Sequence, residues 1–209
     1  MRHGNDQTAR IRRQYDEMAP KYDRIMAPFE RWFLDGGRDW VGSRTRGDVL
    51  EIAVGTGRNL PHYPAGTALA GLDLSPEMIE IARERARGLD LTVDLAVGDA
   101  QELPFEDASF DTVVSTLSLC TIPDPHQAIG EVRRVLRPDG RFVALEHVRS
   151  PNRIVRLVQR VLDPLAVRCA CDHLLREPLD VLEPGGFEIE QLERSKLGII
   201  ERVVARKPA

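Results

Sequence analysis

Two glycines, Gly55 and Gly57, close an apolar run in the sequence DVLEIAVGTGRNL, which begins at Asp48. Because glycine has no Cβ, a turn of this kind lets a ligand approach the main chain closely. Asp73 ends the next apolar run, where a carboxylate can accept hydrogen bonds from a ribose. Asp99 ends the run after that, and its carboxylate can accept a bond from an adenine amino group. This spacing predicts a nucleotide-cofactor site and fits both nicotinamide and adenosyl cofactors.

The glycine turn differs from two common nucleotide-binding turns. A nicotinamide site usually has a third glycine that packs helix on strand, but Leu60 stands at that position and no second catalytic domain follows. A phosphate-binding P-loop requires Gly-Lys-Ser/Thr, which is missing from the turn. A tight strand-to-helix turn without any ligand is the remaining alternative.

Strands and helices of the expected length alternate from about residue 48 onward, which is typical of βαβ units on a parallel sheet. Ser75 and Pro76 provide an N-cap and a first helical residue after the second strand. The last two strands are close enough to pair as a hairpin, which predicts an antiparallel edge. We predict strands over 49–54, 67–74, 91–97, 110–116, 141–147, 187–193 and 197–205, and helices over 76–87 and 125–136.

The segments outside this alternation are predicted to be helical. Aromatic residues recur at roughly helical intervals within 1–47, which indicates helices that form a lid over one edge of the sheet. Residues 151–184 are expected to form helices that break at Pro164 and Pro178. The predicted organisation is one domain, 1–209, made of a helical lid (1–47), a cofactor-binding core (48–147), a helical substrate-side insertion (148–184) and a terminal hairpin (185–209).

Composition limits the class of protein. The 209 residues are 42% hydrophobic and 30% charged, which suits one globular domain. A formal net charge of −4 argues against a protein that mainly coats nucleic acid. The odd count of three cysteines and the polar N-terminus indicate a reducing, cytoplasmic setting, and no apolar run approaches the ~20 residues that span a bilayer.

Six segments resemble, in order, the signature segments of the class I S-adenosylmethionine-dependent methyltransferases, over nearly the whole chain. They are VLEIAVGTG, LDLSPEMIEIAR, GDAQELPF, FDTVVSTLSLCTIPDP, EVRRVLRPDGRFVALEH and LEPGGF. The resemblance implies a Rossmann-like α/β fold with helices on both faces of a seven-stranded, mostly parallel sheet, whose last strand is antiparallel. It also implies that S-adenosylmethionine is the methyl donor and S-adenosylhomocysteine the product.

The same resemblance implies which residues hold the cofactor. Glu51 and the turn from Ala53 to Gly57 would hold its methionine end, and Asp73 its ribose. Ala53 replaces the usual first glycine of the turn, so its methyl group narrows the approach. The remaining implied contacts are Leu74 and Met78 beside the adenine, Asp99 and Ala100 at the adenine edge, Thr116 and Leu117 facing the sulfonium, and Tyr22, with Tyr15, lining the closed site.

Methyl transfer requires a nucleophile held in line with the methyl group, and a proton acceptor when the nucleophile carries a proton. His147, at the end of the fifth predicted strand, is our candidate for a base or an acceptor-orienting group; a structural histidine is the equal alternative. Cys120 is expected to be a core residue. The segment CACDH, 169–173, lacks the second spaced pair that a zinc site needs, so no metal is expected.

The chain resembles several groups of methyltransferases, and these groups differ in their methyl acceptor. YDEMAPKYD is similar to the N-terminal signature of the quinone and phospholipid methyltransferases, and GRNLPHYPAGT resembles bacterial phospholipid N-methyltransferases. STLSLCTIPDP, ALEHV and QRVLDP resemble the microsomal-type thiol methyltransferases. We therefore favour a small or lipophilic acceptor, a thiol or a phospholipid amine. C-methylation of a quinone ring, a non-catalytic cofactor-binding homologue and a nicotinamide oxidoreductase are the alternatives.

The segment PNRIVRLVQRVLDPLAVR, 151–168, bears on lipophilic acceptors. Arg153, Arg156 and Arg160 share one helical face and apolar residues form another. Such a helix can lie in a membrane interface, which would make the cytoplasmic protein peripheral at the membrane. The preferred interpretation is an ordinary surface helix with its apolar side on the core. The sequence does not specify an oligomeric state.

Overall fold

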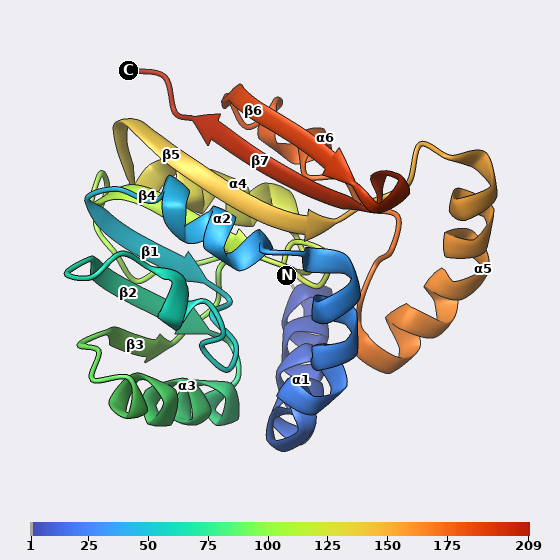
Figure 1. Ribbon diagram of the computed structural model, residues 1–209, viewed down its shortest axis with the longest axis horizontal. Helices are drawn as coiled ribbons and strands as arrows, with labels where there is room; N and C mark the ends of the chain where they lie inside the picture. The colour runs from blue at the N-terminus through green and yellow to red at the C-terminus, as the bar shows by residue number, and fades with distance from the viewer. Residues whose placement is uncertain (1) are drawn as a thin grey trace.

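The computed structural model describes residues 2–209, with side chains described from residue 6 onward. Its centre is a seven-stranded sheet in the order β3-β2-β1-β4-β5-β7-β6 (Figure 1). Neighbouring strands from β3 to β5 are parallel, whereas β7 is antiparallel to both β5 and β6. The predicted fold class is therefore confirmed. The strands are β1 Asp48–Ile52, β2 Ala68–Asp73, β3 Asp94–Val97, β4 Phe110–Thr116, β5 Leu136–His147, β6 Glu188–Ser195 and β7 Ile200–Arg206.

Helices cover both faces of the sheet. Side chains alternate between the faces along each strand, so Leu50 of β1 packs into the cluster that contains α4 and α6, while Val49 packs into the cluster that contains α2. The helices are α1 Arg2–Phe29, η1 Glu30–Leu34, α2 Gly37–Arg44, η2 Leu60–His62, α3 Pro76–Gly88, α4 Pro125–Val135, α5 Arg153–Ala170, α6 Leu179–Leu182 and η3 Lys196–Gly198.

Side-chain caps fix where the helices begin. Ser75 Oγ accepts a hydrogen bond from the Met78 N–H at 3.2 Å and Pro76 is the first residue of α3, as predicted. Asp124 caps α4 through the Gln127 N–H at 3.0 Å. Each cap satisfies a backbone donor that the first helical turn leaves free. The caps therefore place the starts of α3 and α4 at the carboxyl edge of the sheet, next to the site.

Several predicted boundaries differ from the structure. The third strand begins at Asp94 rather than at residue 91, because β3 is an edge strand that pairs only with β2. The fifth strand begins at Leu136, five residues early, because Leu136 pairs with Phe110 before a bulge. The predicted break at Pro164 is wrong, since α5 continues through it. A proline removes the hydrogen bond to the carbonyl four residues earlier, here that of exposed Arg160, where water can replace the lost donor.

The orientation of α5 is a further correction. The preferred prediction placed its apolar side on the core, but six large apolar residues of α5 are between 48% and 76% exposed. Gln159 is the residue of this helix that is buried. The helix extends away from the sheet at one side of the molecule (Figure 1). Its apolar face is thus left without a partner in the described chain.

Candidate active site

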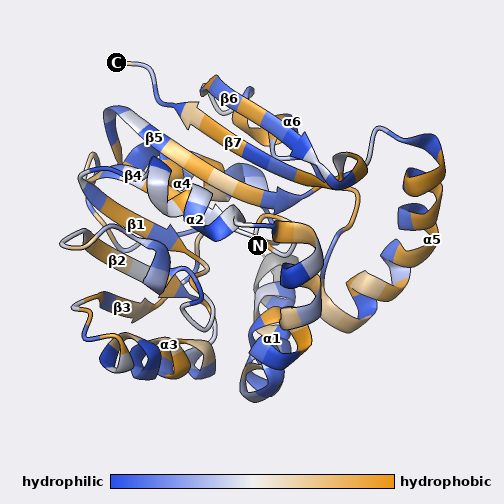
Figure 2. Ribbon diagram, viewed as in Figure 1, coloured by the Kyte–Doolittle hydropathy of each residue, from blue (hydrophilic) through white to orange (hydrophobic). Residues whose placement is uncertain are grey.

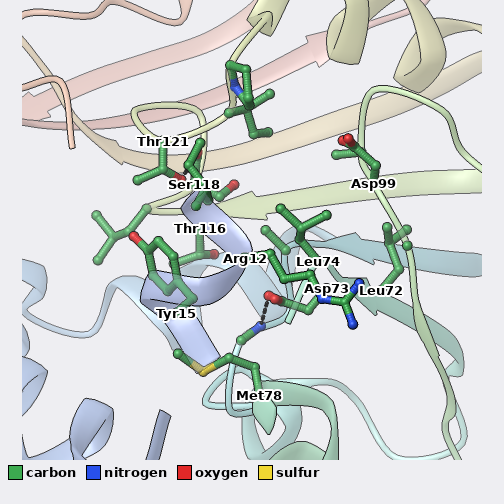
Figure 3. Close-up of a pocket in the computed structure, with 18 of the residues that line it drawn as sticks. Arg12, Tyr15, Leu72, Asp73, Leu74, Met78, Asp99, Thr116, Ser118 and Thr121 are labelled. Atoms are coloured by element: carbon green, nitrogen blue, oxygen red, sulfur yellow. Dashed lines mark hydrogen bonds between the residues drawn. The ribbon is translucent and has the colours of Figure 1, made fainter. Parts of the chain in front are cut away.

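A cavity of about 80 Å³ lies where the carboxyl ends of the parallel strands meet α1 (Figure 3). This is the edge of an open α/β sheet at which ligands bind. Tyr15 of α1 lines the cavity together with Asp73 and Thr116 at the strand tips (Figure 3). Ten of the twelve predicted cofactor residues line it: Tyr22, Ala53, Gly55, Asp73, Leu74, Met78, Asp99, Ala100, Thr116 and Leu117.

The glycine turn meets the cavity at Gly55 and supports it at Gly57. All three residues Ala53, Gly55 and Gly57 have positive φ angles, of 50°, 56° and 77°. A Cβ added at Gly55 would meet nothing within 4 Å, so this position leaves open space for a ligand. A Cβ at Gly57 would instead lie 2.8 Å from the Leu60 side chain, so this glycine lies outside the cavity lining and serves packing. Ala53 holds a left-handed conformation that glycine adopts without strain.

Asp73 is the buried acid of the cavity. Its Oδ2 accepts a hydrogen bond from the Gly55 N–H and its Oδ1 accepts one from the Ser75 N–H, both at 2.9 Å. Burial raises the pKa of this carboxyl to about 6, although the two backbone donors oppose the rise. Each oxygen keeps a second lone pair, so the carboxylate can still accept hydrogen bonds from a diol.

Asp99 lies across the cavity at the end of β3 (Figure 3). Its Oδ1 accepts a hydrogen bond from the Gln101 N–H at 2.9 Å, and the Gln101 side-chain amide donates to both carboxylate oxygens. The side-chain oxygen of Gln101 in turn accepts from the Asp124 N–H, just before α4, and its main-chain carbonyl accepts from the Gln127 side-chain amide in the first turn of α4. Gln101 thereby fixes the direction of the Asp99 carboxylate.

Glu51 lies outside the cavity lining, beneath the glycine turn. It is 2% exposed, and its carboxylate accepts hydrogen bonds from Asn59 Nδ2 at 2.7 Å and from the Tyr63 hydroxyl at 2.8 Å. Burial raises its pKa to about 7. Asn59 Nδ2 also donates to Thr116 Oγ1 at 2.9 Å. Glu51 therefore reaches the cavity only through Asn59, and its contact with the methionine end of the cofactor stays a prediction.

Asn59 gives no signal in the sequence, and neither does the ion-pair network around it. Its Oδ1 accepts from Arg38 Nη1 at 2.6 Å, and Arg38 pairs with Glu30 of η1. Arg58, in the glycine turn, pairs with the same Glu30 at 2.8 Å and with Asp23 of α1 at 3.3 Å. The partners are separated by 8 to 35 residues and follow no periodic pattern, so sequence reasoning missed them.

A second hydrogen bond joins α1 to the glycine turn. The Thr56 hydroxyl donates to Asp23 Oδ1 at 2.6 Å, and Asp23 also pairs with Arg85 of α3. Burial would raise the pKa of Asp23, but the bonds from Thr56 and the arginines lower it below its ordinary value. The covering helix is therefore tied to the same turn that borders the cavity.

His147 faces a different cavity, of about 260 Å³. Its Nε2 lies 2.9 Å from Asp172 Oδ1, and the Cys120 thiol lies beside this pair. Burial opposes the charged imidazole, yet the ion pair with Asp172 raises the pKa of His147 above its ordinary value. The loop 117–123 separates the two cavities, since Leu117 and Ser118 line the first and Leu119 and Cys120 the second. His147 is thus outside the lining of the cofactor cavity.

Tyr15 approaches both cavities. It lines the first, and burial, followed by the nearby Cys120 thiol, raises the pKa of its hydroxyl well above the ordinary value; the charge of Asp172 adds to the rise. Its hydroxyl lies 3.5 Å from the Ala170 carbonyl at the end of α5. Tyr15 therefore lies on the cofactor side of the loop 117–123, near the His147–Asp172 pair.

The segment CACDH does not converge on one point. Cys169 is exposed, and the Cys171 thiol donates to Gln14 of α1 at 3.0 Å. Asp172 alone joins His147 and Cys120, where one atom from each of the three residues lies within 4.8 Å of the others. Thiol, imidazole and carboxylate groups are ligand types that zinc accepts. The expectation that no metal binds here stays a prediction.

The sheet order, the glycine turn and the two acids at strand tips define a Rossmann-like fold with a nucleotide-cofactor site. The family described as "Methyltransferase domain" matches residues 50–144. The chain is 34% identical to the demethylmenaquinone methyltransferase of Thermus thermophilus over 159 residues, which cover 70% of each chain. It belongs to the class I S-adenosylmethionine-dependent methyltransferases, and its cofactor is S-adenosylmethionine.

The names of relatives in this family indicate different methyl acceptors. The chain is 38% identical to the phosphatidylethanolamine N-methyltransferase of Cereibacter sphaeroides, over 56% of this chain and 58% of the relative. It is 33% identical to the thiol S-methyltransferase TMT1B of Rattus norvegicus, over 75% and 66%. The chain spans 45% to 70% of the length of these relatives. The lowest value, 45%, is for the mitochondrial methyltransferase OMS1 of Saccharomyces cerevisiae.

Solved structures agree on the fold. A SAM-dependent methyltransferase from Methanosarcina mazei superposes with a TM-score of 0.64 at 23% identity, covering 81% of this chain and 97% of that one. The residues around the first cavity fit such a cofactor. The open position at Gly55 admits a ligand against the main chain, and the buried Asp73 carboxylate has lone pairs left for hydroxyl groups.

Proposed function

We propose that this protein methylates a lipophilic acceptor that carries a thiol or an amine, and that His147 receives or directs the acceptor's proton. The observation that carries this proposal is the pair formed by buried His147 and half-buried Asp172, with His147 lining a cavity next to the cofactor cavity. A C-methylation of a quinone-type ring is the alternative, favoured by the similarity to demethylmenaquinone methyltransferase.

The cofactor, when bound, supplies a methyl group already activated on a sulfonium, so the protein's tasks are positioning and proton management. Asp73, the Gly55 main chain and Asp99 would hold the cofactor in the first cavity. A thiol or ammonium acceptor must lose one proton for its lone pair to form the new bond to carbon, while the bonding pair of the broken bond stays on sulfur. Neutral His147 can take that proton at the ring nitrogen that Asp172 does not contact.

The surroundings of His147 suit a lipophilic acceptor. Leu119, Leu175 and Val181 contribute apolar surface to the second cavity, together with Pro125 and Pro178. The acids Glu146, Glu177 and Asp180 line it as well. Arg176 is the basic residue in this lining, and its guanidinium donates to the Leu119 and Ile122 carbonyls. Apolar surface with polar groups placed among it is typical of small-molecule sites, and an acceptor with one polar group on a lipophilic body matches this lining.

The test is a transfer assay with isotopically labelled methyl on S-adenosylmethionine. The acceptors are a small aliphatic thiol, phosphatidylethanolamine vesicles and a demethylated quinone, each in its own tube, with products located by mass spectrometry. Label on the thiol or the lipid amine supports the proposal, and label on the quinone ring alone overturns it. Cofactor binding without any label transfer would overturn the proposal in favour of an acceptor of another class or a non-catalytic homologue. A thermal shift with NAD but none with S-adenosylmethionine would indicate a different cofactor.

A matched pair of variants tests the role of His147. His147→Asn removes the titrating ring, whereas Asp172→Asn keeps the ring and removes the charge that raises its pKa. We expect His147→Asn to lower kcat by ~10²-fold or more. Asp172→Asn should shift the acidic limb of the pH–rate profile to lower pH, because the imidazole then loses its proton more readily. An unchanged profile in both variants would reduce His147 to a structural residue.

A further inference from the structure

Helix α5 carries its apolar residues on the outside. Six of them recur at helical spacing along one arc, with exposed fractions of 48% to 76%. They are Ile154, Leu157, Val158, Val161, Leu162 and Leu165. Figure 2 shows hydrophobic residues along this helix where it projects from the sheet. An exposed apolar arc of this length on a described helix marks an interaction surface.

Polar side chains, rather than apolar ones, anchor this helix to the rest of the protein. The Gln159 amide donates to the Val148 carbonyl at 2.9 Å and to the Leu174 carbonyl at 3.2 Å, and its oxygen accepts from the Ser150 N–H. Asp163 accepts from the Leu174 N–H at 2.8 Å. Anchoring by hydrogen bonds holds α5 in place without the use of its apolar face, which therefore remains available.

The charges on α5 indicate what the exposed face contacts. The helix has four arginines and one aspartate, although the whole chain has a formal net charge of −4. Arg153 and Arg160 are exposed beside the apolar arc. Apolar residues flanked by arginines match an anionic bilayer surface. The apolar residues can contact the acyl chains, and the arginines can pair with the anionic headgroups. A second copy of this chain would instead bring like-charged arginines toward one another.

A neighbouring turn extends the same surface. Leu197 of η3 is 68% exposed, and its carbonyl accepts from the Ser150 hydroxyl at 2.6 Å, just before α5. Lys196 adds a cation next to it, 3.9 Å from Asp35. No helix in residues 2–209 is long and apolar enough to cross a bilayer. Leu197 and Lys196 thus continue the apolar and basic character of α5.

We propose that α5 docks this protein on a bilayer that contains anionic lipid. This inference rests on the proposed function and deepens it, because it identifies the membrane as the source of the lipophilic acceptor. The far end of α5 contacts α1 through Gln14 and leads directly into Asp172, the partner of His147. A docked α5 therefore places the membrane beside the cavity proposed for the acceptor.

Vesicle co-sedimentation of the full chain tests the docking without any need for turnover. The vesicles are phosphatidylcholine alone and phosphatidylcholine with phosphatidylglycerol, at low and high salt. We expect binding to the mixed vesicles, at least tenfold weaker binding to the neutral ones, and weakening by salt. The double variant Leu157→Ser/Val161→Ser should lose at least tenfold in binding. Arg153→Gln/Arg160→Gln should lose the preference for anionic lipid.

Matched controls keep the result interpretable. Leu89→Ser/Leu192→Ser removes two exposed leucines outside α5 and should bind as the unchanged protein does. Circular dichroism establishes that each variant is folded. Equal binding of the α5 variants and the unchanged protein, or no binding by either, would overturn the docking. Sedimentation as a dimer that the α5 variants dissociate would assign the face to a second copy. Label transfer to a soluble thiol by a protein that binds no vesicles would leave the proposed function standing and remove the docking.

Discussion

Glu51→Gln is the substitution with the most direct consequence for stability. Glu51 is buried, and its pKa is about 7 in the folded protein against an ordinary value of 4.5. A carboxyl whose pKa is raised by folding binds its proton more tightly in the folded state. Its contribution to stability is therefore full below pH 4.5 and is lost as the pH rises toward 7. Glutamine keeps an oxygen that accepts from Asn59 or Tyr63, but it cannot titrate.

The size of the effect follows from the two pKa values. Between about pH 5 and about pH 8, the unequal deprotonation of the two states costs the natural protein ~2.5 kcal/mol of unfolding free energy. The difference in unfolding free energy between Glu51→Gln and the natural protein should grow by that amount over the same interval. Asp73 and Glu146 have raised pKa values as well. Both remain in the variant, so their contributions cancel in this difference.

Urea unfolding at the two pH values, followed by far-UV circular dichroism, measures both proteins. The exposed Glu17→Gln is the control for the loss of one negative charge. A difference that stays within ~0.5 kcal/mol between the two pH values would refute the reasoning. It would mean that the Asn59 and Tyr63 donors hold the Glu51 carboxylate ionised as readily as water does.

Three further substitutions test the site itself. Asp73→Ala removes both acceptors that remain for a diol, so S-adenosylmethionine binding by calorimetry should weaken by ~10- to 100-fold, and unchanged binding would contradict its role. Ala53→Gly relieves a left-handed backbone, and thermal unfolding should show a gain of up to ~1 kcal/mol; a loss would mean that the alanine methyl packs usefully. Asn59→Ala removes donors to buried Glu51 and should cost ~2–4 kcal/mol in urea unfolding, whereas a neutral result would mean that water replaces the amide.

The sequence predicted the sheet and the tips of its strands well, because both leave local signals. Alternating apolar runs give the strands, and an acid after a buried strand gives Asp73 and Asp99, which the structure brings to one cavity. Glu51 lies one position from the apolar core residue Leu50, and the pattern could not tell a residue that lines the cavity from one that supports it.

Other features depend on contacts that have no periodicity. Arg38, Arg58 and Glu30 meet only because the chain folds α1 and η1 back over the glycine turn. The amphipathic pattern of α5 is the same whether its apolar arc faces inward or outward. Polar anchors set the direction: Gln159 donates to the Val148 and Leu174 carbonyls outside the helix, and Asp163 accepts from the Leu174 N–H. The sequence does not predict these hydrogen-bond partners.

The narrowness of the first cavity has a kinetic consequence. Its volume of about 80 Å³ is below the ~300–1,000 Å³ of typical small-molecule sites, because α1 lies across the strand tips. We expect the cofactor to enter when α1 withdraws, which would break the contacts of Asp23 with Thr56 and Arg85. We therefore expect slow association and slow product dissociation. At saturating acceptor concentration, the withdrawal of α1 would then be the rate-limiting step of turnover, rather than the transfer of the methyl group.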